Sequence, residues 1–240
     1  KKMPVCKIRL NMDILFQPHL FVVGKTGAGK TYFMKKILQE LETPFWVFAP
    51  SDEYDDLVCQ GLSVYDDVIL YLDIESLVFY LGLNATEEAI LRKLVYEYYA
   101  KKAMRRPRQI SFDFGDEENN DVELPTYANT LSSKLRLLSH LKFSFDRKKT
   151  KLPSRSVVFD MSRYTQLEQE CMMNYYLYRL MFQCRGKREN SKKHIVVIEE
   201  AHNYLPSTQK TQCKDIIVKL AREGRKHGIF LCFITQRPRY

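Results

Sequence analysis

An eight-residue stretch near the start of this 240-residue sequence constrains the fold more than any other feature. Residues 24–31 read Gly-Lys-Thr-Gly-Ala-Gly-Lys-Thr and fit the pattern G-x-x-x-x-G-K-[ST] of a phosphate-binding loop. The pattern is informative only between a strand and a helix. The apolar run His19–Val23 is typical of a strand, and apolar residues recur at helical spacing from Lys30 onward. The stretch therefore predicts an α/β fold in which this loop joins a strand to a helix.

The composition of the loop fits the binding of phosphate groups. Its glycines let the main chain approach an anion closely, and its N–H groups and the positive end of the following helix face that anion. Lys30 is expected to reach the β- and γ-phosphates of a nucleotide, and the Thr31 hydroxyl is expected to bind Mg²⁺. The nucleotide-binding residues predicted in this way are Gly24, Lys25, Thr26, Gly27, Ala28, Gly29, Lys30 and Thr31.

Segments with strand character alternate with segments of helical character along the chain. This alternation predicts a mostly parallel sheet flanked by helices. The expected strands are Leu20–Val23, Phe45–Ala49, Val68–Leu72, Ser156–Asp160, Ile195–Ile198 and Ile229–Thr235. Besides the helix from Lys30, the expected helices are Thr86–Met104, Tyr127–Leu141, Thr165–Cys184 and Thr211–Lys226.

Residues 84–153 interrupt this alternation with two helices and with runs of basic and acidic residues. The first of these helices is preceded by Asn84 and Glu87 at capping-box spacing, as the later helix is by Thr165 and Glu168. We expect one α/β domain over residues 1–240, with residues 84–153 as a helical insertion within it.

The bulk composition is compatible with several functions. The chain carries 38 Lys and Arg residues against 29 Asp and Glu residues, a formal net charge of +9, which suits either a polyanionic partner or a soluble basic surface. Six scattered cysteines form no C-x-x-C pair and no zinc-like cluster, which favours free thiols in a reducing cytoplasm. No apolar run of 18 residues and no signal peptide is visible, so we expect no membrane span.

Two carboxylates follow the apolar strand expected at residues 195–198. In phosphate-loop NTPases the first acid after such a strand holds the metal, usually through water, and a second can polarise the attacking water. Glu199 and Glu200 occupy these places, and their alternation along the strand would separate the two roles. Gln236, at the tip of the last strand, is either a contact for the γ-phosphate and the water or a neutral strand terminus.

Arg222 and Arg225 are three residues apart and share a helix face. One interpretation is that these cations stabilise the carboxyl end of the helix. The spacing alone favours this interpretation. The other is an arginine finger that reaches the nucleotide of a neighbouring subunit.

Three stretches together resemble one family. They read GKTGAGKT at 24–31, VVIEEAHNYLP at 196–206 and AREGRKHGIFLCFITQRP at 221–238. They resemble the HerA branch of the HerA/FtsK superfamily of hexameric DNA-pumping ATPases. The lead-in Pro4–Leu10, followed by Pro18–Phe21, is also similar to the approach to the HerA phosphate loop. Between about residues 50 and 155 the sequence shows no motif of this family.

The resemblance implies a RecA-like ASCE core, ATP hydrolysis between the subunits of a ring, and double-stranded DNA threaded through the centre. It places the strand that ends at Gln236 between the phosphate-loop strand and the strand of the acid pair. It assigns Mg²⁺ binding to Thr31 and Glu199, partly through water. The catalytic residues it implies are Glu200, Lys30, Gln236, Arg222 and Arg225. By this resemblance, Arg222 is the first candidate for an arginine finger supplied in trans. His202 either relays the nucleotide state or is a packing residue.

The sequence departs from the family pattern at Glu199, where the family usually has Asp. Its phosphate loop begins at residue 24, without the amino-terminal barrel of full-length HerA, and the sequence stops at Tyr240. We expect either a trimmed motor core or a naturally minimal relative, such as a viral packaging ATPase.

Four functions stay open at this point. The first is a HerA-type DNA translocase or helicase that processes DNA ends with a nuclease such as NurA, and the second is a viral genome-packaging ATPase that works with a capsid. The third is a small-substrate kinase with its acceptor site in 84–153, and the fourth is a nucleotide-gated binding module. No guanine-reading N-K-x-D motif and no LSGGQ signature is present, which argues against a GTPase and an ABC transporter ATPase.

Two expectations concern surroundings and partners. The expected location is the cytoplasm of an archaeon or bacterium, or of the host cell if the protein is viral. Residues 185–193 and 203–210 are candidates for contacts with DNA, and each can equally be a solvated loop.

Overall fold

The computed structural model describes residues 19–58, 63–64, 69–71, 74–102, 126–144, 152–153, 155–184 and 193–237. The lead-in Pro4–Leu10 and residues 185–192, for which we made predictions above, lie outside the described residues.

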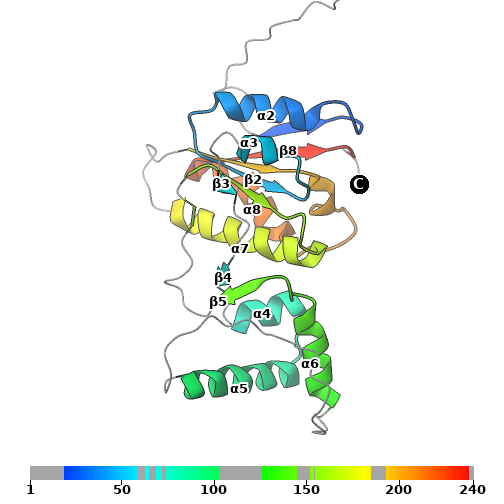
Figure 1. Cartoon of the computed structure of the whole chain (residues 1–240), viewed down its shortest axis with the longest axis vertical. Helices are drawn as coiled ribbons and strands as arrows, with labels where there is room; N and C mark the ends of the chain where they lie inside the picture. The colour runs from blue at the N-terminus through cyan, green and yellow to red at the C-terminus, as the bar shows by residue number, and fades with distance from the viewer. Residues whose placement is uncertain are drawn as a thin grey trace, which may run out of the picture.

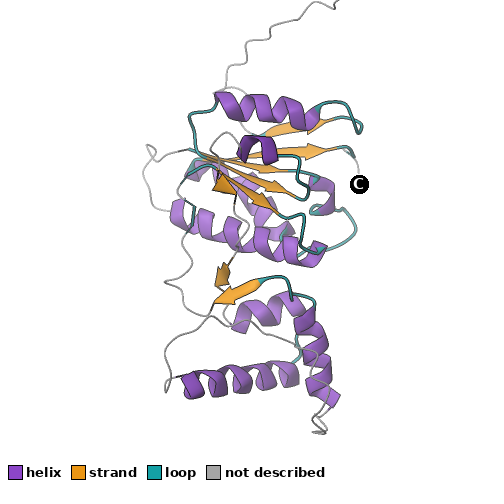
Figure 2. Ribbon diagram, viewed as in Figure 1, coloured by secondary structure: helices purple, strands orange, loops and turns teal. Residues whose placement is uncertain are grey.

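A six-stranded parallel sheet forms the centre of the described structure (Figures 1 and 2). Its strands are β1 (Leu20–Val23), β2 (Phe45–Ala49), β3 (Ser63–Val64), β6 (Val157–Asp160), β7 (His194–Ile198) and β8 (Ile229–Thr235). Their order is β1-β8-β7-β2-β6-β3, and every neighbouring pair is parallel. The predicted α/β fold is thus confirmed. Strand β8 lies between the strand of the phosphate loop and the strand of the acid pair, as the resemblance implied.

Helices cover both faces of this sheet (Figure 1). Helices α2 (Lys30–Glu40) and α3 (Asp55–Val58) lie on one face, and α7 (Gln166–Cys184) and α8 (Lys214–Glu223) lie on the other. Alternate residues of β7 serve the two sides, because Val197 packs in the apolar cluster with Met34 of α2 while Val196 packs in the cluster with Leu177 of α7. Burial on both faces explains the continuous apolar runs of β2, β7 and β8. Among the described helices, none combines the length and the apolar character needed to cross a membrane.

A second group of elements lies beyond α7 in Figure 1. It contains helices α4 (Ile74–Leu81), α5 (Ala85–Lys102) and α6 (Thr126–Arg136), and strands β4 (Ile69–Tyr71) and β5 (Lys142–Ser144). These two strands pair with each other and form a separate two-stranded parallel sheet. The prediction of a strand at Val68–Leu72 was right, but its implied place in the main sheet was wrong. A short apolar run indicates a strand without indicating its partner.

Both predicted capping boxes are present. At the start of α5, the Asn84 N–H donates to Glu87 Oε2 and the Glu87 N–H donates to Asn84 Oδ1, each at 2.9 Å. Before α7, the Thr165 N–H donates to Glu168 Oε2 at 2.9 Å. The Glu168 carboxylate also accepts the main-chain N–H of His140 at 2.8 Å, and it therefore ties the turn after α6 to the start of α7.

Candidate active site

The phosphate loop connects the end of β1 to the start of α2, as predicted. Gly27 and Gly29 have φ angles of 76° and 82°, which a residue with a side chain rarely adopts. Gly29 directly precedes the helix, so this conformation aims the first helical N–H groups at the loop. The Gly24 N–H donates to the carbonyl oxygen of Thr235 at 3.4 Å, which joins the start of the loop to the end of β8.

The Lys30 side chain folds back over this loop. Its Nζ donates to the carbonyl oxygen of Lys25 at 3.2 Å. An ammonium group in this position lies beside the main-chain N–H groups of the loop and the amino end of α2, which together form an anion-binding surface.

Glu199 and Glu200 leave the end of β7 in different ways. Glu199 is buried, with 5% of its surface exposed. Glu200 has φ 48° and ψ 43°, and it is the one residue other than glycine with positive φ in the described part of the chain. We expected alternation along the strand to separate the two carboxylates. In the structure the strand ends at Ile198, and a left-handed turn at Glu200 follows it.

A chain of polar contacts joins the loop to Glu200. The Thr26 hydroxyl donates to Gln236 Oε1 at 2.5 Å, and Gln236 Nε2 donates to both Glu200 carboxylate oxygens at 3.4 Å. His202 Nδ1 lies 3.1 Å from Glu200 Oε2 and 3.2 Å from Thr235 Oγ1. These contacts bring together three segments that lie far apart in the sequence.

Two residues of the site were missed by the sequence analysis. Glu53 and Tyr54 follow β2, whose carboxyl end lies at the same edge of the sheet as those of β7 and β8. Glu53 Oε2 accepts the hydroxyl of Thr31 at 2.6 Å, and the Tyr54 hydroxyl donates to Glu199 Oε1 at 2.5 Å. The carboxylate a few residues after an apolar strand was a visible signal. Its relevance depends on the strand order, which places β2 beside β7.

Burial changes the acidity of this pair. The pKa of the Glu199 carboxyl is raised to about 7, chiefly by desolvation and also by the nearby charges of Glu53 and Glu200, while the hydroxyl groups of Tyr54 and Thr31 oppose the shift. Burial and then the negative charge of Glu199 raise the pKa of Tyr54 well above its ordinary value. The Tyr54 hydroxyl therefore keeps its proton and acts as the donor.

The oxygen atoms gathered here suit Mg²⁺. Mg²⁺ is commonly held by one or two carboxylates together with the phosphates of a substrate. The Thr31 hydroxyl and the Glu199 carboxylate are linked through Glu53 and Tyr54, which are consecutive residues. These residues fit the predicted metal site in the chemistry of their donor atoms.

Arg222 and Arg225 are not part of this cluster. Arg222 lies in the last turn of α8, and Arg225 lies in the short helix η3 (Gly224–His227) that leads into the start of β8. Both are exposed. They therefore lie at the amino edge of the sheet, whereas the phosphate loop and the acid pair lie at its carboxyl edge.

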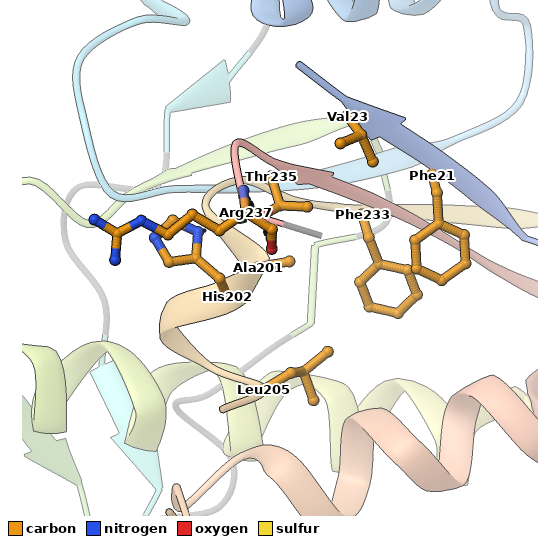
Figure 3. A pocket seen from close by; sticks show the side chains of 8 residues that line it. All are labelled: Phe21, Val23, Ala201, His202, Leu205, Phe233, Thr235 and Arg237. Atoms are coloured by element: carbon orange, nitrogen blue, oxygen red, sulfur yellow. Dashed lines mark hydrogen bonds between the residues drawn. The ribbon is translucent and has the colours of Figure 1, made fainter. Parts of the chain in front are cut away.

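A small pocket adjoins the polar network on the β1 side (Figure 3). Its volume is about 170 Å³. His202 and Thr235 line its polar part, and the stacked rings of Phe21 and Phe233, with centroids 4.9 Å apart, line its apolar part. This pocket is separate from the phosphate loop, whose residues do not line it.

Residues 2–180 match the family model described as Helicase HerA, central domain. The chain belongs to this HerA family. The matched range includes the phosphate loop, Glu53 and Tyr54, and it ends before the acid pair.

Individual relatives extend the similarity over nearly all of the sequence. A probable helicase of Methanocaldococcus jannaschii, MJ1565, is 21% identical over 278 residues, an alignment with 97% of this chain and 52% of the relative. The DNA double-strand break repair helicase HerA of Saccharolobus solfataricus is 27% identical over 266 residues, with 97% of this chain and 53% of the relative covered. The chain thus spans about half the length of these two relatives.

A solved structure supports the fold. VirB4 of Thermoanaerobacter pseudethanolicus superposes with a TM-score of 0.58 at 17% identity, over 91% of this chain and 70% of that one. This likeness shows that the HerA-family chain shares the fold of VirB4.

Proposed function

We propose that this chain is the motor domain of an ATP-driven double-stranded DNA translocase of the HerA type, which acts in the processing of DNA ends. One observation carries the proposal: the phosphate loop, Gln236 and the acid pair meet at the carboxyl edge of one parallel sheet. Ligands of open α/β sheets bind at this edge. The names of the HerA relatives, which are double-strand break repair helicases, support the DNA substrate.

The residues of the loop and the acid pair divide the work of ATP hydrolysis. Lys30 and the loop N–H groups bind the β- and γ-phosphates. Glu200, held by Gln236 and His202, orients and polarises the attacking water. Because Gln236 contacts both Thr26 and Glu200, it is placed to register whether a γ-phosphate lies between the loop and the base.

Thr31 and Glu199 would hold Mg²⁺, the latter partly through water. When bound, Mg²⁺ neutralises charge on the β- and γ-phosphates. Glu199 is buried and faces Tyr54, whereas Glu200 faces Gln236, so the metal-holding and water-activating roles fall to different sides of the turn.

Arg222 cannot serve the nucleotide of its own chain. The seven residues of β8 separate η3 from Gln236, and at roughly 3.3 Å per residue they span roughly 23 Å. We therefore propose that Arg222 and, as second choice, Arg225 act in trans, on the nucleotide of the next subunit in a ring that we propose to be hexameric. There the guanidinium would stabilise charge in the transition state. DNA would be held through its phosphates, without sequence preference and with strong dependence on salt.

The test is the rate of ATP hydrolysis with and without double-stranded DNA. The motor proposal predicts a rate that rises when DNA is added and that is abolished by Lys30→Ala. Glu200→Gln should retain ATP binding and lose roughly 10²- to 10⁴-fold in turnover, the range expected for loss of a general base. If the rate of ATP consumption does not change with DNA but rises when a small phosphate acceptor is added, the chain is a kinase and the motor proposal is wrong. Full turnover in Glu200→Gln would remove Glu200 from the mechanism.

A further inference from the structure

The turn that follows β2 touches both protein groups assigned to the metal. Glu53 and Tyr54 are consecutive, yet their side chains reach different neighbours. Glu53 Oε2 accepts the Thr31 hydroxyl at 2.6 Å, and the Tyr54 hydroxyl donates to Glu199 Oε1 at 2.5 Å. Two adjacent residues thus connect the end of the phosphate loop with the end of β7.

Tyr54 is itself held firmly. Only 1% of its surface is exposed, and its ring packs in the apolar cluster between the sheet and α2. Lys35 Nζ lies 5.6 Å from the ring centroid, and the same ammonium pairs with Asp56 at 2.7 Å. A ring fixed by packing places its hydroxyl at one point in space.

Glu199 needs such a fixed partner. A glutamate side chain has three rotatable bonds, and a buried carboxylate without hydrogen bonds is costly. Because only 5% of the Glu199 surface is exposed, its carboxylate depends mainly on donors from the protein, and the hydrogen bond from the Tyr54 hydroxyl favours one arrangement of it.

Glu53 orients the Thr31 hydroxyl in a similar way. A hydroxyl has one proton to donate and lone pairs that can bind a cation. When the Thr31 proton points to Glu53, the lone pairs of the same oxygen face away from Glu53. This is the orientation that a hydroxyl ligand of Mg²⁺ requires.

We propose that Glu53 and Tyr54 are positioning residues for the metal site, which set the orientation of Thr31 and Glu199 without binding the nucleotide themselves. The inference rests on the proposed function, because it assigns Mg²⁺ to these two groups. Partners that orient metal ligands typically change metal affinity by roughly 10- to 100-fold when removed.

Tyr54→Phe is the central variant, since it removes the hydroxyl and keeps the ring. Tyr80→Phe is its matched control, because the buried Tyr80 hydroxyl bonds to Asn174 between α4 and α7, away from the site. Two quantities are measured: the affinity for a fluorescent ATP analogue in EDTA and in Mg²⁺, and the Mg²⁺ concentration that gives half-maximal hydrolysis. We expect Tyr54→Phe to raise that concentration about 10-fold, with affinity in EDTA unchanged, and Tyr80→Phe to change neither.

Glu53→Ala should act in the same direction. Its control is Glu42→Ala, which removes the same charge from the exposed residue before β2, at the opposite edge of the sheet. Tyr54→Phe is also made in a Glu199→Gln background. There it should have no further effect on the Mg²⁺ dependence, because Tyr54 acts through Glu199.

Three results would overturn the inference. The first is an unchanged Mg²⁺ dependence in Tyr54→Phe. The second is an equal loss of Mg²⁺ affinity on Tyr54→Phe in the wild-type and the Glu199→Gln backgrounds. The third is a loss of nucleotide affinity in EDTA together with a lower melting temperature than that of Tyr80→Phe, which would make Tyr54 merely structural. Failure of the motor proposal is distinguishable, since a chain that never hydrolyses ATP can still show the predicted change in Mg²⁺-dependent nucleotide affinity.

Discussion

At the scale of single residues, Glu200 combines a strained backbone with a proposed catalytic role. Its φ of 48° lies in the left-handed region, where a residue with a Cβ is disfavoured. Such conformations persist where the surrounding structure imposes them, often at functional sites. The turn aims the carboxylate at Gln236 and His202, so the strain is tied to the geometry that the proposed mechanism needs.

This strain predicts a difference between two inactive variants. Glu200→Gly and Glu200→Ala both remove the carboxylate, but only glycine adopts positive φ freely. We expect Glu200→Gly to be more stable than Glu200→Ala by about 1 kcal/mol, measured by denaturant unfolding. Equal stabilities would show that the surrounding structure relaxes around alanine at no cost.

Some residues of the candidate site could be predicted from the sequence, and others could not. Lys30, Thr31, Glu199 and Glu200 were found because each belongs to a pattern with a fixed position relative to an expected strand. Glu53 and Tyr54 belong to no such pattern. Their contacts depend on β2 lying beside β7, a pairing that the spacing along the chain does not encode.

At the scale of elements, the predictions succeeded where the apolar runs are continuous. Strands β1, β2 and β8 have the expected bounds, because each is a continuous apolar run. Strands β3 and β5 and helices α3 and α4 were missed. The two strands have two and three residues, too few for a period to be visible, and α4 is a short apolar helix whose periodicity resembles that of a buried strand.

The cap of α5 gives a prediction at this scale. Asn84 and Glu87 exchange two hydrogen bonds at the amino end of the helix. Asn84→Ala should destabilise the protein by about 1 kcal/mol, because a helix N–H loses its partner. Asn84→Ser, which can still accept that N–H, should recover most of the loss in the same denaturant titration. A silent Asn84→Ala would mean that α5 unfolds outside the main transition.

The packing of α7, α8 and β8 protects their cysteines. Cys171, Cys213 and Cys232 are buried. Burial raises the pKa of Cys213 to about 12 and raises the pKa of Cys171 and of Cys232 well above the ordinary value. The thiolate is the reactive form, so at pH 8 iodoacetamide should leave these three thiols unmodified in the folded protein.

Peptide mapping by mass spectrometry checks this expectation, with the guanidinium-unfolded protein as the control in which all three react. Rapid modification of Cys232 in the folded protein would show that β8 separates from its neighbours, which its place between β1 and β7 in the sheet argues against.

At the scale of the whole molecule, the parallel sheet separates the two sets of residues that the proposed mechanism uses. All strands of the main sheet run in the same direction, so the nucleotide residues collect at the carboxyl edge and the exposed Arg222 lies at the amino edge. A chain with complementary parts of one site on opposite edges suits head-to-tail assembly, in which each copy completes the site of the next.

Mixing two inactive variants tests this arrangement. Lys30→Ala destroys the phosphate loop and keeps the arginine, whereas Arg222→Ala does the reverse. In a randomly mixed ring with equal amounts of each, about a quarter of the interfaces join an intact loop to an intact arginine. ATPase activity should therefore return towards about a quarter of the wild-type rate when each site works independently, in samples shown to be oligomeric by light scattering. Lys30→Ala mixed with Glu200→Gln provides the control, because both residues belong to the same subunit's site and no interface regains both. If the Arg222 mixture stays as inactive as this control, the arginine does not act between subunits, and the two-edge mechanism fails.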